Sequence, residues 1–305
     1  YIKIEIYFLI YSLIKMTFKE NIKQHLQEHG WVVIPDVLSE EEIEHAKTSF
    51  YSWQKTIPNH ETFYRKCVRY GIYQSHEVGH QYHAWFIRTR PAVQNVFKML
   101  WDCEDLIVSF DGTGYISQET NKKDTIWTHT DQAPATKGLS CYQGLVSLTS
   151  NKERTFVVYD KSHLLHETYF AERNNDSKNN WNKIDPAYLD TLKEHKQVLH
   201  VPAGALVIWD SRTFHQNQYG EPGSEERIVQ YVCYLPREHE KNTEAMRKKR
   251  QKYYLERRTT SHWPTPIYVK PLQSNTYGDA SLKIDYSTLT PPDLSSLKDE
   301  IQLII

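Results

Sequence analysis

The pattern of apolar and polar positions begins with helical spacing. Thr17–His29 carries apolar residues on one helical face, and that pattern stops at Gly30. The apolar stretch 31–35 then indicates a short strand. Ser39–Glu42 matches a capping box, in which a serine and a glutamate satisfy each other's backbone N–H groups, and it predicts a helix running to about Trp53. Residues 16–104 are therefore expected to form a helical flank, with an irregular stretch at 54–80.

From about residue 105 the apolar residues fall into short runs separated by turn residues. The predicted strands are Leu106–Phe110, Tyr115–Ser117, Ile126–Asp131, Leu139–Thr149, Phe156–Asp160, Gln197–Val201, Leu206–Trp209 and Ile228–Leu235. Many short strands with turns between them are typical of a jelly roll. The pattern thus predicts a mainly β fold with flanking helices.

Helical patterns surround and interrupt these strands. One is expected near Pro91–Cys103, a second forms an insert at Leu164–His195, and a third covers Glu238–Arg258. A tail rich in proline, serine and threonine follows. We therefore divide the chain into a leader at 1–15, an N-terminal helical flank at 16–104, a core of strands at 105–237, and a C-terminal helix and tail at 238–305.

The leader differs from the rest of the chain. Its apolar run Ile6–Ile14 is too short to span a bilayer, and no clear small-residue cleavage site follows it. We expect Met16 to be the natural start and residues 1–15 to be non-native or disordered. A membrane-associating or packed segment is the alternative.

Composition narrows the functional classes. The net charge is −1, so bulk binding to nucleic acid or to an anionic membrane is not expected, and the basic helix at 247–258 is interpreted as a solvated face. The four cysteines are scattered without a C-x-x-C pair, and Cys141 and Cys233 lie in apolar runs. Buried free thiols and an intracellular, cytoplasmic location are therefore expected.

The candidate chemistry begins with His129 and Asp131. Side chains two apart on a strand leave the same face, so this imidazole and this carboxylate can bind one ion. His215 ends a later strand-like run and is a candidate third ligand. Two histidines and a carboxylate are typical of non-haem iron(II) oxygenases. The triplet alone is weak evidence, since H-x-D arises by chance about 0.7 times in such a chain.

Further residues strengthen this interpretation. Arg227 follows His215 by twelve residues on another strand-like run, and a buried guanidinium near a metal favours a carboxylate ligand. Gln143 is a lone polar residue in an apolar strand, where it either faces the pocket or makes a structural hydrogen bond. Trp127 and Trp209 flank the candidate ligands and are expected to wall the site or to pack in the core.

The order of these motifs resembles the phytanoyl-CoA dioxygenase-like family of iron(II)- and 2-oxoglutarate-dependent dioxygenases. The likeness covers about residues 30–237 and is strongest over 127–237. The segments that carry it are the H-x-D at 129–131, Gly-Leu-Val-Ser-Leu at 144–148, Phe-Val-Val-Tyr-Asp-Lys-Ser-His at 156–163, the run at 204–215 that ends in His215, and Arg227.

This resemblance implies a double-stranded β-helix (jelly roll, cupin-like) that hydroxylates an unidentified substrate and releases succinate and CO2. Iron(II) would be bound by His129, Asp131 and His215, and Arg227 would bind the distal carboxylate of 2-oxoglutarate. O2 is the oxidant, and ascorbate is a candidate reductant. Asn217 is either a further hydrogen-bonding partner of 2-oxoglutarate or a turn residue.

The resemblance leaves the substrate open. The sequence departs from the family at 153–155, where Glu-Arg-Thr replaces a paired glycine, so substrate identity does not carry over. A small molecule or an acyl group is the expected substrate class.

Two alternatives remain at this point. His76-Glu77-Val78-Gly79-His80 matches the H-E-x-x-H pattern of zinc hydrolases, in which two histidines one helical turn apart bind zinc and the glutamate is the base. Glycines at 71 and 79 disfavour the stable helix that this motif needs, and a polar loop near the site is the competing interpretation. A metal-binding jelly roll without catalysis is the third hypothesis, and it would lack a substrate cavity.

Overall fold

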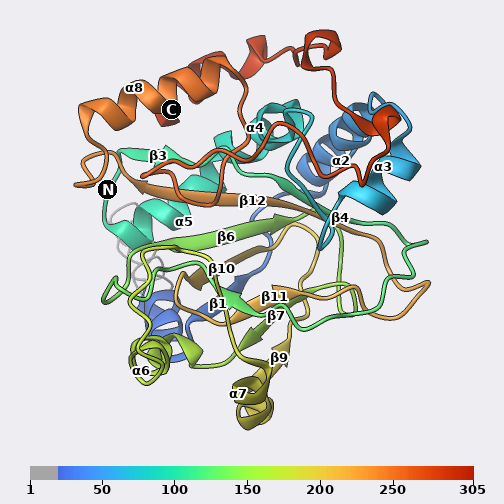
Figure 1. The fold of residues 1–305 in the computed structure, drawn as a ribbon. Helices are drawn as coiled ribbons and strands as arrows, with labels where there is room; N and C mark the ends of the chain where they lie inside the picture. Colours follow the sequence, from blue (N-terminus) through green and yellow to red (C-terminus); the bar gives the residue numbers. More distant parts are fainter. Residues whose placement is uncertain (1–19) are drawn as a thin grey trace, which may run out of the picture.

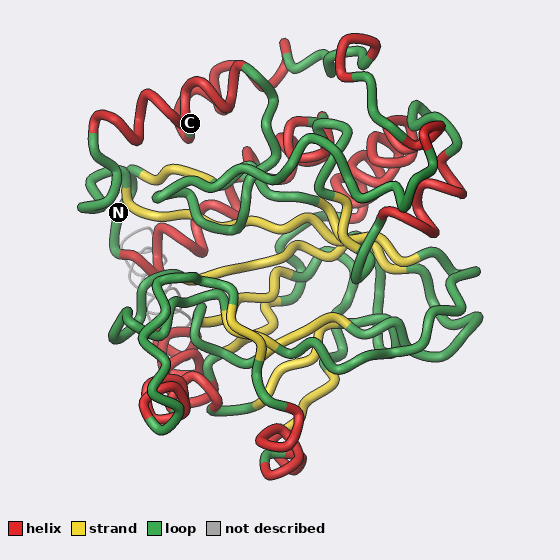
Figure 2. The backbone as a smooth tube through the Cα atoms, in the orientation of Figure 1, coloured by secondary structure: helices red, strands yellow, loops and turns green. Residues whose placement is uncertain are grey.

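The protein is described by a computed structural model covering residues 20–305. The expectation for residues 1–15 lies outside the described residues. Two antiparallel β-sheets form the centre, with most of the helices over one outer face and a few on the opposite side (Figure 1; Figure 2). The mainly β architecture with flanking helices is therefore as predicted. None of the helices in the described part of the chain is long and apolar enough to cross a membrane.

The larger sheet supplies most of the core. In sheet order it contains β1 (Trp31–Ile34), β10 (Leu206–Asp210), β6 (Tyr142–Ser147), β12 (Arg227–Pro236), β4 (Thr113–Ile116) and β2 (Ile72–Tyr73), with β3 (Leu106–Val108) also paired to β12. Alternation decides which face each side chain takes. Leu206 and Ile208 pack under the helices, whereas Val207 and Trp209 pack between the sheets. Because both faces are covered, the central strands are mostly apolar, and the few polar side chains in them need a partner.

The smaller sheet carries two of the predicted metal ligands. Its order is β8 (Asn182–Lys183), β5 (His129–Thr130), β11 (His215–Asn217), β7 (Phe156–Tyr159) and β9 (Lys196–Val198). The antiparallel register of β11 against β5 places His215 directly opposite His129. Residues 86 positions apart in sequence thus become cross-strand neighbours, which is the contact that the jelly roll provides.

The helices pack mainly on the outer face of the larger sheet (Figure 1). Their bounds are α2 (Glu40–Gln54), α3 (His60–Cys67), α4 (Tyr82–Thr89), α5 (Pro91–Trp101), α6 (His166–Ala171), α7 (Pro186–Thr191), α8 (Glu244–Leu255) and α9 (Lys298–Ile304). The predicted capping box is present, since the Glu42 N–H donates to Ser39 Oγ at 3.2 Å and the Ser39 N–H donates to Glu42 Oε2 at 3.0 Å. Residues 20–29 are helical and end at Gly30, whose φ is +83°.

Several predicted boundaries were wrong. The insert 164–195 is not one helix but contains α6, β8 and α7, since its polar middle pairs with β5. The helix expected at 238–258 begins only at Glu244, where Thr243 caps it. The strand predicted at 126–131 is reduced to β5, because the preceding residues reach Gln216 through side-chain hydrogen bonds instead.

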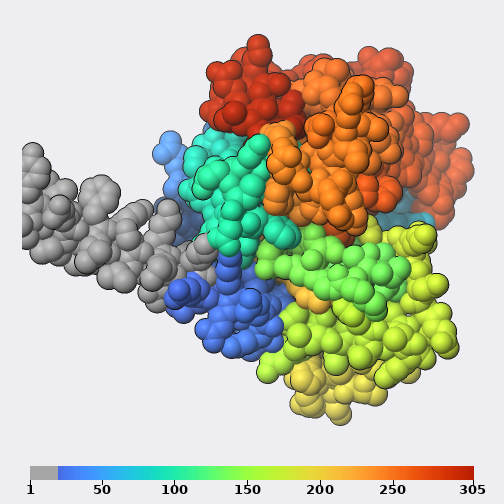
Figure 3. All heavy atoms as spheres, turned by 90° about the vertical axis from the view of Figure 1, so that its left-hand side faces the viewer, coloured from blue at the N-terminus to red at the C-terminus, as the bar shows by residue number. Residues whose placement is uncertain are grey.

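The C-terminal residues return to the centre of the molecule. We call residues 259–275 the C-terminal segment. It is fixed by Thr260, whose N–H donates to the Phe110 carbonyl at 2.8 Å and whose Oγ1 accepts from the Phe110 N–H at 3.0 Å. Figure 3 shows the orange and red C-terminal third packed against the teal residues near α5. All four cysteines are free, and Cys141 and Cys233 are buried as expected.

Candidate metal centre and substrate cavity

His129, Asp131 and His215 converge on one point. Asp131 Oδ2 lies 3.5 Å from His129 Nε2 and 3.3 Å from His215 Nε2, and all three residues are buried. Their donor atoms lie within 4.8 Å of one another, an arrangement that can hold a metal ion. Neighbouring ligands of an octahedral ion at 2.0–2.3 Å are separated by about 3 Å, so the observed spacing fits three ligands on one face.

Backbone carbonyls orient both imidazoles. His129 Nδ1 lies 3.2 Å from the Trp127 carbonyl, and His215 Nδ1 lies 2.8 Å from the Thr213 carbonyl. A carbonyl only accepts, so each Nδ1 is protonated and each Nε2 lone pair is directed inward. Burial, reinforced by the neighbouring His129, lowers the pKa of His215. The ring is thus held in the neutral form that binds metals.

A hydrogen-bond chain fixes the carboxylate. Gln143 Nε2 donates to Asp131 Oδ2 at 3.1 Å, and Trp209 Nε1 donates to Gln143 Oε1 at 2.8 Å, so the indole determines how the amide is oriented. Gln143 therefore faces the site and acts through Asp131. Burial alone would raise the pKa of Asp131, but His262 and His129 outweigh it and hold that pKa well below its ordinary value. The carboxylate is therefore ionised.

Arg227 and Asn217 form a second polar group, of which Asn217 lines the same cavity as the triad. Arg227 is buried, and its Nη2 donates to Asn217 Oδ1 at 3.0 Å. Asn217 Nδ2 in turn donates to the Tyr231 hydroxyl at 2.7 Å. Arg227 Nη1 is buried and has no hydrogen-bond partner among the described residues. A buried guanidinium with an unused N–H group is a suitable anchor for a carboxylate.

The triad opens into a cavity of about 950 Å3. Trp127 and Trp209 both line it, and Trp209 also packs in the apolar cluster between the sheets, so the two alternatives drawn from the sequence are not exclusive. The cavity also reaches residues that the sequence did not indicate, from the 69–75 segment, the 178–181 segment and the C-terminal segment. Its size is near the upper end for small-molecule sites. A reachable cavity argues against the metal-binding jelly roll without catalysis.

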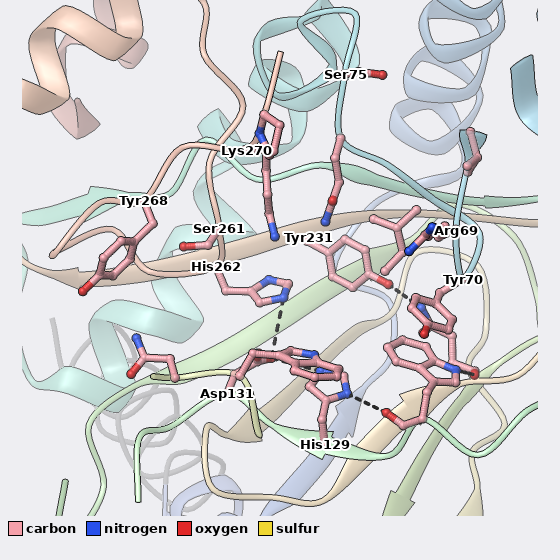
Figure 4. Close-up of a pocket in the computed structure, with 18 of the residues that line it drawn as sticks. Arg69, Tyr70, Ser75, His129, Asp131, Tyr231, Ser261, His262, Tyr268 and Lys270 are labelled. Carbon is pink, nitrogen blue, oxygen red and sulfur yellow. Dashed lines mark hydrogen bonds and ion pairs between the residues drawn. The ribbon is translucent and has the colours of Figure 1, made fainter. Parts of the chain in front are cut away.

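The C-terminal segment supplies the functional residues that sequence reasoning missed. His262 Nε2 lies 3.6 Å from Asp131 Oδ2, while its Nδ1 forms an ion pair with Asp111 (Figure 4). Trp263 Nε1 donates to the Asp131 carbonyl at 3.0 Å. Burial would lower the pKa of His262, but Asp111 and Asp131 raise it above its ordinary value. No motif or periodicity marks these residues, since they lie in irregular backbone.

The zinc-hydrolase alternative was wrong. His76 and Glu77 have φ values of +54° and +56°, so the motif is not helical. Glu77 Oε2 accepts from Arg257 at 2.7 Å, and His80 Nε2 contacts the Arg258 carbonyl at 3.1 Å. These side chains therefore bind the C-terminal part of the chain. The polar-loop interpretation of the motif agrees better with the structure.

Comparison with known proteins gives a limited match in sequence. No family model matches the chain, so the resemblance to the phytanoyl-CoA dioxygenase-like family stays a prediction. Ava biosynthesis cluster protein O from Aspergillus versicolor is 30% identical over 174 residues, which are 52% of this chain and 56% of that protein. The chain thus matches little more than half the length of this curated relative.

The fold is shared with several solved structures. The epimerase SnoN, in complex with Fe3+, alpha ketoglutarate and nogalamycin RO, has a TM-score of 0.52 at 17% identity over 72% of this chain and 84% of that one. The alpha ketoglutarate dependent carbocyclase SnoK from nogalamycin biosynthesis gives 0.51 at 18% identity, over 71% and 83%. HygX from Streptomyces hygroscopicus, with nickel and 2-oxoglutarate bound, gives 0.50 at 13% identity, over 71% and 86%. The chain therefore has the predicted double-stranded β-helix, or jelly-roll, fold.

Proposed function

We propose that this protein is an iron(II)- and 2-oxoglutarate-dependent dioxygenase that hydroxylates a small molecule. The proposal is carried by the open triad of His129, Asp131 and His215. It is joined by the buried, partly unpaired Arg227, which donates to Asn217 in the wall of the same cavity. Three protein ligands leave three positions of an octahedral ion free, whereas a structural metal site normally fills them. Two proteins that share this fold support the proposal, since SnoN binds Fe3+ with alpha ketoglutarate and HygX binds nickel with 2-oxoglutarate.

The side chains present fit both groups. His129, Asp131 and His215 would hold the iron through their inward-facing atoms, and Gln143 would keep the carboxylate in place. Arg227 would bind the distal carboxylate of 2-oxoglutarate. When bound, iron(II) with 2-oxoglutarate supplies the oxidative chemistry, in which dioxygen is reduced, 2-oxoglutarate becomes succinate and CO2, and a substrate C–H bond is oxidised.

The protein contributes position and exclusion of water. Asn217 bridges Arg227 and Tyr231 and thereby fixes the position of the guanidinium. Among the described residues no carboxylate forms an ion pair with Arg227 that would compete with 2-oxoglutarate. Trp127, Trp209 and Phe156 surround the ligands with apolar surface. A desolvated site strengthens the charge interactions that hold the cosubstrate. Hydroxylation is proposed because an open cavity beside the metal lets a C–H bond approach it.

The test has two stages. Anaerobic titration of the protein with iron(II) and 2-oxoglutarate should produce a visible metal-to-ligand absorption band. Exposure to O2 with ascorbate should then produce succinate slowly without any added substrate. His129→Ala should lose both signals, whereas His200→Ala, which changes an exposed histidine, should keep both.

The two stages separate binding from turnover. A band without succinate means that the site binds its cosubstrate but requires the true substrate before it reacts with O2. Absence of both signals in the unmodified protein would disprove the proposed function. Once substrate is known, a product heavier by one oxygen atom would establish hydroxylation, and an isomerised or cyclised product would refute that part of the proposal.

A further inference from the structure

We propose that the substrate of this site carries an acidic group attached to a flat aromatic or polycyclic body. The inference names the substrate class of the proposed function and rests on it for the reaction, but not for the binding itself. Two features of the cavity wall carry it: cations without acidic partners, and aromatic rings with exposed faces.

The charges that line the cavity are unbalanced. Among the described lining residues Asp131 is the only carboxylate, whereas Arg69, Lys178 and Lys270 are cations. The iron and its partners do not use these cations. Iron(II) brings two positive charges and Arg227 one, while Asp131 brings one negative charge and 2-oxoglutarate two, so the loaded centre is neutral. The cations of the wall are therefore available to another anion.

Lys270 is the cation best placed to bind it. Its backbone is fixed, since the Lys270 N–H donates to the Thr259 carbonyl at 2.9 Å and the Lys270 carbonyl accepts from Arg258 at 3.3 Å. Its side chain extends from the C-terminal segment toward His262 (Figure 4). No hydrogen bond or ion pair engages its ammonium within the described part of the chain. The positive charge of Lys270 acts to lower the pKa of His262, as expected if the ammonium lies close to the imidazole.

The other two cations are less suited to this role. The guanidinium of Arg69 donates to the Tyr277 hydroxyl at 2.5 Å and lies over the Tyr277 ring, so it is already engaged. Lys178 is exposed at the rim, where water screens its charge. Lys270, in contrast, is half-buried. An ammonium in such a position binds a carboxylate more strongly than one in bulk water. The anion is therefore expected beside Lys270.

Aromatic rings define the rest of the wall. Tyr70 stacks on Trp127 with ring centroids 4.1 Å apart and planes 16° apart. Trp181 is 51% exposed and its ring lies 5.3 Å from that of His129, while Tyr268 is 52% exposed. Single exposed aromatics are common on protein surfaces, but these line one cavity together with the cations. Ring faces of this kind bind flat apolar ligands by stacking.

Binding of simple model acids tests this inference. The protein, loaded with redox-inert nickel(II) and 2-oxoglutarate, is titrated with 2-naphthoate and with the neutral 2-naphthamide, and tryptophan fluorescence is followed. We expect 2-naphthoate to bind about tenfold more tightly, as one charge-assisted hydrogen bond allows. Lys270→Gln should remove this preference, whereas Lys248→Gln, on the exposed face of α8, should retain it. Trp181→Leu should weaken both compounds.

The opposite results would overturn it. Equal affinity for acid and amide in the unmodified protein, or an unchanged preference in Lys270→Gln, removes the role of Lys270. A loss of 2-oxoglutarate affinity in Lys270→Gln would show that this lysine binds the cosubstrate instead. If nickel and 2-oxoglutarate do not bind at all, the proposed function fails. The acid preference and its loss in Lys270→Gln are then measured in the metal-free protein, so the two failures are distinguishable.

Discussion

Replacing Arg227 with methionine should stabilise the ligand-free protein and abolish cosubstrate binding. The guanidinium is 1% exposed, bonds to Asn217 through Nη2, and leaves Nη1 unpaired. No acidic residue in the described part of the chain forms an ion pair with it. A buried charge without a partner costs several kcal/mol, and a methionine of similar length removes that charge while filling most of the space.

The magnitudes follow from these contacts. Loss of the Asn217 hydrogen bond and imperfect packing offset part of the gain, which leaves about 1–3 kcal/mol of stabilisation. For a domain of this size that corresponds to a rise in Tm of roughly 2–8 °C. Loss of two charge-assisted hydrogen bonds to 2-oxoglutarate costs about 3–5 kcal/mol, so its Kd should rise about 10²- to 10⁴-fold.

Thermal unfolding with and without 2-oxoglutarate, under anaerobic iron(II), measures both effects. The cosubstrate should raise the Tm of the unmodified protein but not that of Arg227→Met, and Arg227→Lys should lie between them because an ammonium lacks the bidentate fork. Arg154→Met is the matched control. Arg154 is equally buried, but its guanidinium donates to Ser224 Oγ at 2.9 Å and to the Thr120 carbonyl at 2.7 Å, so its loss should destabilise the protein.

Two results would refute this reasoning. If ligand-free Arg227→Met has a lower Tm than the unmodified protein, the guanidinium stabilises the fold and the reasoning is wrong. A 2-oxoglutarate-induced rise in Tm that survives the substitution would place the cosubstrate anchor elsewhere.

Three further predictions concern the metal centre and the acid response. Asp131→Ala should abolish succinate formation, whereas Glu77→Gln should preserve it, and the reverse ranking would restore the zinc motif. Gln143→Leu should weaken iron(II) binding about 10- to 100-fold in an anaerobic titration, because Asp131 loses its orienting donor; unchanged affinity would contradict that role. Burial, reinforced by a nearby arginine, lowers the pKa values of His80 and His83 to about 3, so the unfolded chain binds more protons below pH 6.5. The stabilisation from these neutral histidines should therefore be fully present above pH 6.5. Below that pH the free energy of unfolding should fall by about 1.4 kcal/mol per pH unit for each histidine. Urea unfolding at pH 7 and at pH 5 measures this difference, and equal free energies at the two pH values would contradict it.

The parts of the site that lie on strands could be predicted from sequence. His129 and Asp131 are two residues apart, and His215 closes an apolar run, so alternation alone places their side chains on defined faces. Gln143 was recognisable as a polar residue in an apolar strand. The sequence did not show that Gln143 faces the pocket. That orientation depends on the pairing of β6 with β10, which places Trp209 opposite Gln143.

The rest depends on long-range contacts that leave no local pattern. Asp131 and Trp263 are 132 residues apart, and the segment that carries Trp263 has neither helical nor strand periodicity. The H-E-x-x-H motif failed for the opposite reason. Its local pattern is strong, but contacts of Glu77 and His80 with the residues after α8 hold it in a non-helical backbone.

The candidate metal site and the proposed substrate-binding wall of the cavity lie on different kinds of backbone. The candidate metal ligands His129 and His215 lie on paired strands, where a substitution disturbs the sheet register, whereas Tyr268 and Lys270 lie in a segment with almost no regular structure. Exposed irregular backbone accepts substitutions and length changes far more readily than a buried strand does. If the proposed function holds, substitutions in the exposed and half-buried residues 268–275 should change which molecule is bound, while the candidate metal site on the strands stays the same.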